Sequence, residues 1–222
     1  MFSFEAWWQI LTTKLPVFFQ GVGTTVELAL YTAIFGTLLG IVVALLRMSK
    51  IKVLKVLAGV YIEFLRGTPL LVQVLIVFYG LPQLGIKLPR LTAGTVALVI
   101  NSAAYMAEIV RSGIQAIDGG QTEASRSLGM NGFQTMIYII LPQAIKNILP
   151  AIGNEFVSII KESSILYTIG IYELTYQANK LASTNFRYLE TLTISALIYF
   201  VLTFTASRLL GLLERRMRRG DR

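Results

Sequence analysis

Long stretches without any charged residue, separated by short basic clusters, constrain this sequence more than any other feature. Leu28 to Leu46 carries no charge between Glu27 and Arg47, and it makes about 28 Å of helix, close to the thickness of a bilayer core. Gly67 to Ile86 and Thr191 to Ser207 are also free of charge. Only 14% of the 222 residues are charged, whereas a soluble domain carries about 25%. The chain is therefore predicted to be an all-α integral membrane protein.

The chain has no cysteine and no histidine. Their absence removes disulfides, the usual zinc ligands and the thiolate and imidazole groups of many enzymes. We therefore predict no catalytic residue and no metal site, and we expect a transport subunit rather than an enzyme. The net charge is +8, but the basic residues flank the apolar stretches, as the positive-inside rule predicts, so no nucleic-acid partner is expected.

The apolar stretches predict five spans within one transmembrane domain of residues 1–222. Their approximate ranges are 28–46, 56–81, 91–117, 143–164 and 191–207. The fourth is expected to be one span kinked at Pro150, although a hydropathy window could divide it into two. Residues 1–16 are predicted to form a short interfacial helix, because aromatic side chains favour the headgroup level. These aromatics are Phe2, Phe4, Trp7 and Trp8.

Basic residues determine the predicted orientation. They cluster in the first loop and in the tail, so both are placed in the cytoplasm, with the N-terminus outside and the C-terminus inside. The cluster residues are Arg47, Lys50, Lys52 and Lys55, and then Arg208, Arg215, Arg216, Arg218, Arg219 and Arg222.

Three local features of the first two spans carry predictions. Gly36 and Gly40 form a small-xxx-small pair that permits close helix contact. Pro69 is expected to bend the second span or to mark a junction. Glu63 and Arg66 lie three residues apart on one helix face, so they can pair.

A polar segment at residues 118–136 separates the third and fourth spans on the cytoplasmic side. Gln121 to Leu128 is predicted to form one or two helical turns, with Glu123 and Arg126 able to pair at i, i+3. Gly129 stands where a glycine commonly ends a helix. Leu128 and Met130 offer apolar anchorage, so the segment can seat in a cleft of another protein.

The spacing within and after this segment resembles the EAA loop of binding-protein-dependent ABC permeases, which that family uses to dock on its ATPase subunits. The matching residues are Glu123, Ala124, Ser125, Gly129, Ile139, Leu141 and Pro142. Ser125 stands where the family most often has alanine. The resemblance implies that coupling involves Glu123, Ala124, Ser125, Arg126, Leu128 and Gly129.

Further runs resemble the polar amino acid branch of that family, which handles histidine, glutamate, glutamine, arginine and opines. They are Arg66 to Gln73 (RGTPLLVQ), Ala104 to Ile109 (AYMAEI), Ser127 to Met130 and Lys161 to Ser164. Together the matches cover roughly residues 20–215. They imply a type I ABC importer permease bundle in a prokaryotic inner membrane, working by alternating access.

The same resemblance implies partners. They are two ATPase subunits, a second permease subunit (a homodimer or a close paralogue) and an extracytoplasmic solute-binding protein. The chain has no G-x-x-x-x-G-K-[ST] loop, so ATP and magnesium are expected on the ATPase partner and no cofactor is expected in this chain.

Polar residues within spans are candidates for a substrate pathway, because lipid cannot satisfy them. Asn101, Tyr105 and Glu108 share one face of the third span. The fourth span carries Asn154, Glu155, Ser158, Lys161 and Glu162. We expect Asn154, Glu155 and Ser158, with Asn101 across from them, to line the pathway near mid-membrane, and Glu155 favours a cationic amino acid.

Structural roles compete with this interpretation. Glu108 can pair with Arg111 at i+3, and Lys161 and Glu162 can pair or extend to the membrane surface. The alternative function is a secondary transporter or channel without an ATPase. Against it, the chain has no obvious inverted repeat, and such a protein has no use for a docking loop.

Overall fold

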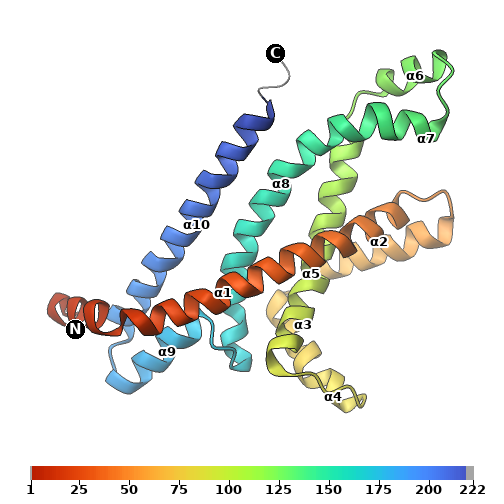
Figure 1. The fold of residues 1–222 in the computed structure, drawn as a ribbon. Helices are drawn as coiled ribbons and strands as arrows, with labels where there is room; N and C mark the ends of the chain where they lie inside the picture. The colour runs from red at the N-terminus through yellow and green to blue at the C-terminus, as the bar shows by residue number, and fades with distance from the viewer. Residues whose placement is uncertain (1, 219–222) are drawn as a thin grey trace.

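The computed structural model describes residues 2–218, with side chains to residue 216, and their regular secondary structure is entirely helical (Figure 1). Arg219 and Arg222 of the predicted basic tail lie outside the described residues. The α-helices are α1 (Phe4–Arg47), α2 (Lys52–Gly67), α3 (Leu70–Leu75), α4 (Leu81–Gln83), α5 (Arg90–Gln115), α6 (Gly119–Ser127), α7 (Gly132–Thr135), α8 (Leu141–Glu162), α9 (Leu174–Asn185) and α10 (Tyr188–Arg218). Two π-helical turns, η1 (Ile76–Gly80) and η2 (Met136–Ile140), and a 3₁₀ segment, η3 (Ser163–Ile169), join them.

The helices are long and apolar enough for a multi-pass membrane protein. Within the described residues, four continuous helical segments qualify as spans: 4–47, 90–115, 132–169 and 188–216. A fifth span results when α2 and the α3–α4 segment, which meet at a bend of 108°, are counted as one. The fourth predicted span is thus a single continuous helical segment, and Pro150 lies inside α8.

Helix α1 is far longer than one membrane crossing. Its 44 residues span about 66 Å, roughly twice the thickness of the hydrocarbon core. The aromatic N-terminal segment therefore continues into the first span without a break, through Pro16. Hydrogen bonds tie its first turns to the start of α10: the Ser3 amide donates to Glu190 Oε1 (2.9 Å) and Trp7 Nε1 donates to Thr193 Oγ1 (3.1 Å).

Small residues bring α1 and α5 together, as the sequence predicts. A Cβ added at Gly40 would lie 2.5 Å from the Cβ of Met106 and 3.0 Å from the Ala103 carbonyl oxygen. At Gly36 the added atom would lie 2.9 Å from Ser102 Oγ. The small-xxx-small prediction is confirmed, and α5 is the helix that α1 approaches.

Gly40→Ala is expected to destabilise the protein, although alanine is the better helix former. Relief of glycine's flexibility is worth about 0.5–1 kcal/mol, but overpacking at a close helix contact costs about 1–3 kcal/mol. Gly23→Ala is the matched control on the same helix, because a Cβ there meets nothing within 4 Å. Thermal unfolding in detergent should show a lower midpoint for Gly40→Ala alone. Equal midpoints for the two variants would contradict the close contact.

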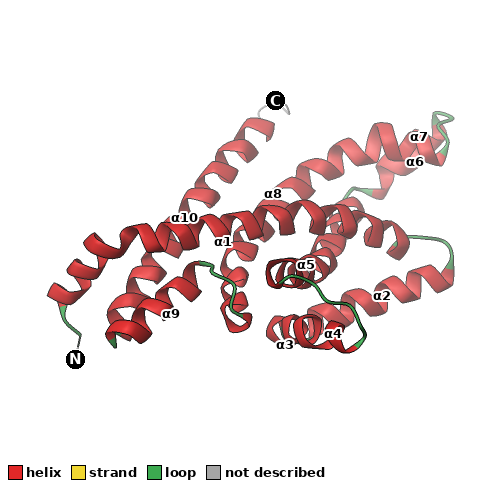
Figure 2. Cartoon of the chain, turned by 60° about the horizontal axis from the view of Figure 1, so that its bottom comes forward, coloured by secondary structure: helices red, strands yellow, loops and turns green. Residues whose placement is uncertain are grey.

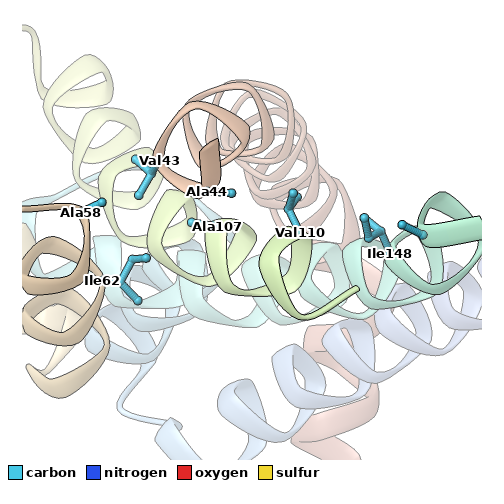
Figure 3. Packing of buried hydrophobic residues seen from close by; sticks show 8 residues of the cluster. Val43, Ala44, Ala58, Ile62, Ala107, Val110 and Ile148 are labelled. Carbon is cyan, nitrogen blue, oxygen red and sulfur yellow. The ribbon is translucent and has the colours of Figure 1, made fainter. Parts of the chain in front are cut away.

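A shared apolar cluster joins α1, α2, α5 and α8 toward the end of the bundle that carries the α1–α2 loop. Figure 3 shows its side chains meeting between these helices. The buried members are Val43, Ala44, Ala58, Ile62, Ala107, Val110, Ala144 and Ile148. Because α5 contributes to this cluster and packs along α1, it is the central helix of the chain.

Helix α9 packs beside the N-terminal half of α1, while α6 and α7 lie at the opposite end of the molecule (Figures 1 and 2). Buried Glu173 caps α9 by accepting hydrogen bonds from the amides of Thr175 and Tyr176 and from the Tyr199 hydroxyl (2.7–2.9 Å). Burial raises the pKa of the Glu173 carboxyl, and these hydrogen bonds oppose the rise. The cap fastens α9 to α10.

Candidate functional site

The bend in the second span lies at Thr68 and Pro69, between α2 and α3, and buried amides stabilise it. Gln73 and Asn101 are both almost fully buried. The Gln73 amide donates to the Leu65 carbonyl (2.8 Å), the Thr68 carbonyl (3.1 Å) and Thr68 Oγ1 (2.8 Å). Asn101 Nδ2 donates to Gln73 Oε1 (2.9 Å) and to the Leu65 carbonyl (3.4 Å). Asn101, which lies on α5, is therefore hydrogen-bonded to both arms of the bent second span.

Arg66 stands at the C-terminal end of α2, directly before this bend. Its guanidinium carbon lies 5.2 Å from the centre of the Tyr105 ring on α5, a cation–π distance. The predicted Glu63–Arg66 pair does not form, because Glu63 instead meets Arg47 at 3.7 Å. Arg66 is thus left facing α5 with its donors available.

The α8 residues divide between two sides of that helix. The Glu155 side chain is partly exposed, and Glu162 follows it on the same side of α8, two helical turns later. Asn154, one residue before Glu155, lines a cavity of about 300 Å³ between α8 and α10 together with Gly153 and Ser207. Successive residues of a helix point about 100° apart, so Asn154 and Glu155 face different neighbours.

Several of these side chains have no polar partner within residues 2–216. Asn154, Glu155 and Ser158 are partly or largely accessible, and none of their side chains forms a hydrogen bond or ion pair with that part of the chain. A span exposes such groups only to a wet cavity or to another protein. These α8 side chains are therefore candidates for contact with a ligand or a partner.

The remaining predicted residues are placed as follows. Glu108 forms a bidentate ion pair with Arg111, one bond of which is Arg111 Nε to Glu108 Oε2 at 2.9 Å. Lys161 is exposed and lies close enough to influence the half-buried Glu162. The structure thus places Tyr105 beside Arg66, whereas Asn101 is buried in the bend.

Sequence reasoning did not select Arg66 or Gln73 for this site. Both lie in the RGTPLLVQ run, and an arginine inside a charge-poor span is itself a signal of function. Gln73 gave no such signal, because an amide in an apolar run becomes informative only when its partners are known.

The segment of residues 118–136, which the sequence predicts to be cytoplasmic, folds into two short helices that brace each other. Asp118 caps α6 by accepting from the Gly120 amide (2.6 Å), and Gly129 leaves the helix with a left-handed φ of 83°. Ser125 is buried, and its hydroxyl donates to the Thr122 carbonyl (2.9 Å) and bonds Thr135 Oγ1 of α7 (3.1 Å). Ser125 thus joins α6 to α7 and does not face outward.

The outward surface of this segment combines charge with large apolar side chains. Glu123, Ala124 and Gly129 are exposed. Leu128 and Phe133 expose 84% and 74% of their surface; Leu128 lies between the spans 90–115 and 132–169, and Phe133 lies at the first turn of the latter. Exposed apolar side chains of this size in water are typical of a docking surface. Arg126 donates to the Met130 carbonyl (3.2 Å), so it shapes the turn and does not pair with Glu123.

Comparison with known proteins gives a consistent result. The family described as "Binding-protein-dependent transport system inner membrane component" matches residues 36–219. The chain is 41% identical over 213 residues to the probable amino-acid permease protein YxeN of Bacillus subtilis (strain 168), covering 95% of each chain. It is 40% identical over 209 residues to the arginine transport system permease protein ArtQ of the same organism, covering 94% of this chain and 95% of that protein.

A solved structure shares the fold. One chain of the crystal structure of an amino acid ABC transporter with histidines superposes with a TM-score of 0.91 at 50% sequence identity. The match covers 97% of this chain and 99% of that chain.

Proposed function

This chain belongs to the family of binding-protein-dependent transport system inner membrane components and is an amino-acid permease subunit of an ATP-binding-cassette importer, and from this premise we propose that it passes cationic amino acids between Arg66 and Glu155. It resides in the inner membrane. The observation that carries the proposal is the Glu155 carboxylate, which is partly exposed on a span and forms no ion pair within residues 2–216.

The two charges suit the two ends of a cationic amino acid. A guanidinium with free N–H groups binds a carboxylate, and a carboxylate binds an ammonium or guanidinium. Tyr105 lies beneath Arg66 and limits the positions it can take. Ser158 and Glu162 extend the polar face by one and two turns beyond Glu155. A relative named for arginine transport and a structure determined with histidines support a cationic substrate, while a relative at 39% identity is named for glutamine.

A second permease subunit is part of the proposal. Only five of the 22 residues of α8 are buried: Ala144, Ile148, Gly153, Ile159 and Ile160. A wet polar face cannot be left open to lipid, so we expect a second copy of this chain to close the pathway. Membership of the family implies ATPase and binding-protein partners. We propose two ATPase subunits, each receiving α6 and α7 of one permease chain.

Glu155→Gln is expected to reduce arginine uptake roughly tenfold to a hundredfold, because a charge-assisted hydrogen bond is worth about 1.5–3 kcal/mol. Glutamine uptake, where it occurs, should change little. Glu27→Gln is the matched control, since Glu27 is an exposed glutamate on α1. The measurement is uptake into proteoliposomes that contain the ATPase and binding protein. Unchanged arginine uptake in Glu155→Gln would remove Glu155 from the pathway.

A further inference from the structure

Two carbonyls lose their helical partners where α2 ends. In a continuous helix the Leu65 carbonyl would accept from the amide of residue 69, but residue 69 is proline and has no N–H. The Phe64 carbonyl would accept from the Thr68 amide and instead accepts from the Thr68 hydroxyl (2.8 Å). A buried carbonyl without a partner is costly. The bend therefore requires donors from outside the helix.

Gln73 and Asn101 supply those donors from two other elements. Gln73 reaches back from α3 to Leu65, and Asn101 reaches across from α5 to both Leu65 and Gln73. One turn earlier, the Tyr61 hydroxyl donates to the Ile100 carbonyl of α5 (2.7 Å). These bonds connect α2, α3 and α5 around the bend, where α2 meets the α3–α4 segment at 108°.

Arg66 follows Leu65 directly, and Tyr105 lies one helical turn after Asn101. The amide network therefore determines where the Arg66 backbone lies relative to the Tyr105 ring, 5.2 Å from the guanidinium. We propose that Gln73 and Asn101 are positioning residues for transport: they hold the bend so that Arg66 stays against the Tyr105 ring. This inference rests on the proposed pathway, and it assigns Asn101 a role in shaping the pathway in place of contact with the substrate.

A double-mutant cycle tests the coupling between the network and Arg66. Gln73→Met keeps the length of the side chain but removes its amide. We expect this variant to raise the KM for arginine uptake about tenfold, because it leaves buried polar groups unpaired. In an Arg66→Gln background the same change should alter KM less than about twofold, because the group it positions is gone. Basal ATP hydrolysis of the assembled complex should stay unchanged.

Two further variants protect the test against misfolding. Asn101→Ala removes the hydrogen bonds from Asn101 but leaves those from Gln73 to Leu65 and Thr68 in place, so the variant is expected to fold. It should raise KM about fivefold. Gln83→Met is the matched control, because within residues 2–216 the Gln83 amide donates only to the Tyr79 carbonyl of its own segment (3.3 Å). It should leave KM unchanged in both backgrounds.

The outcomes separate this inference from the pathway itself. If Arg66→Gln alone leaves KM unchanged, the pathway proposal is wrong. If Arg66→Gln raises KM, but Gln73→Met and Asn101→Ala act equally with and without Arg66, the pathway stands and the positioning inference is overturned. If both act only in the presence of Arg66, the inference is supported.

Discussion

Glu123→Lys is expected to release the ATPase from the permease and to lower ATP-driven uptake at least about tenfold. Glu123 is exposed on α6 and has no ion pair within residues 2–216, so its charge is available to a partner. A charge opposite a complementary interface can be worth more than 1.4 kcal/mol, and its reversal replaces attraction with repulsion. The Leu128 and Phe133 side chains would remain, but hydrophobic contact without charge matching leaves a weaker complex.

The measurement is co-purification of the ATPase with the permease in lipid, followed by ATP hydrolysis and uptake. Glu5→Lys makes the same change of charge at an exposed position in the first turn of α1 and should leave all three unaffected. If Glu123→Lys retains the ATPase and transports normally, α6 does not carry the docking charge.

Arg66→Glu is expected to lower uptake by more than about a hundredfold while leaving the ATPase bound. The change removes the proposed partner of the substrate carboxylate and puts a negative charge in its place. Two unit charges about 4 Å apart interact by about 4 kcal/mol at an effective dielectric of 20, and each 1.4 kcal/mol is about tenfold in affinity. The pathway would then repel the carboxylate of every amino acid.

Lys87→Glu provides the control for Arg66→Glu. It changes the charge by the same amount at an exposed position of the turn before α5, and we expect normal uptake. Glu123→Lys and Arg66→Glu should both lower uptake but differ in ATPase binding: Glu123→Lys loses the ATPase, and Arg66→Glu keeps it. Uptake by Arg66→Glu above about a tenth of the wild-type rate contradicts the role of Arg66.

Periodicity and charge placement predicted the elements of the fold well. Charge-free stretches identified the spans, Pro69 marked the bend of the second span, and Gly40 marked the close approach of α1 to a neighbour. These features depend on local chemistry: the length of a helix in lipid, the missing N–H of proline and the missing side chain of glycine. Effects of this local kind can be predicted from a single sequence.

Which side chains would meet was less predictable. Asn101, Tyr105 and Glu108 do share a helix face, yet each has a different neighbour: Gln73, Arg66 and Arg111. The expected Glu63–Arg66 pair was replaced by Glu63 with Arg47, because α1 brings Arg47 close to α2. Spacing within one helix cannot indicate which charge another helix will present.

The docking loop illustrates the same limit. The EAA-like spacing located it, and Gly129 ends α6 as expected. The sequence pattern treated Ser125 as part of the contact surface, whereas its hydroxyl is buried against Thr135. A small residue in a short helix can serve either a partner or the turn behind it, and only the placement of α7 decides between them.

The hydrogen bonds from Ser3 and Trp7 to the beginning of α10 bear on the order in which the protein is made. The ribosome delivers Ser3 and Trp7 long before Glu190 and Thr193, so the first helix enters the bilayer while its final anchors do not yet exist. Until α10 is made, the first turns of α1 lack these two hydrogen bonds. The attachment of the first turns of α1 to α10 is therefore a late step in biogenesis.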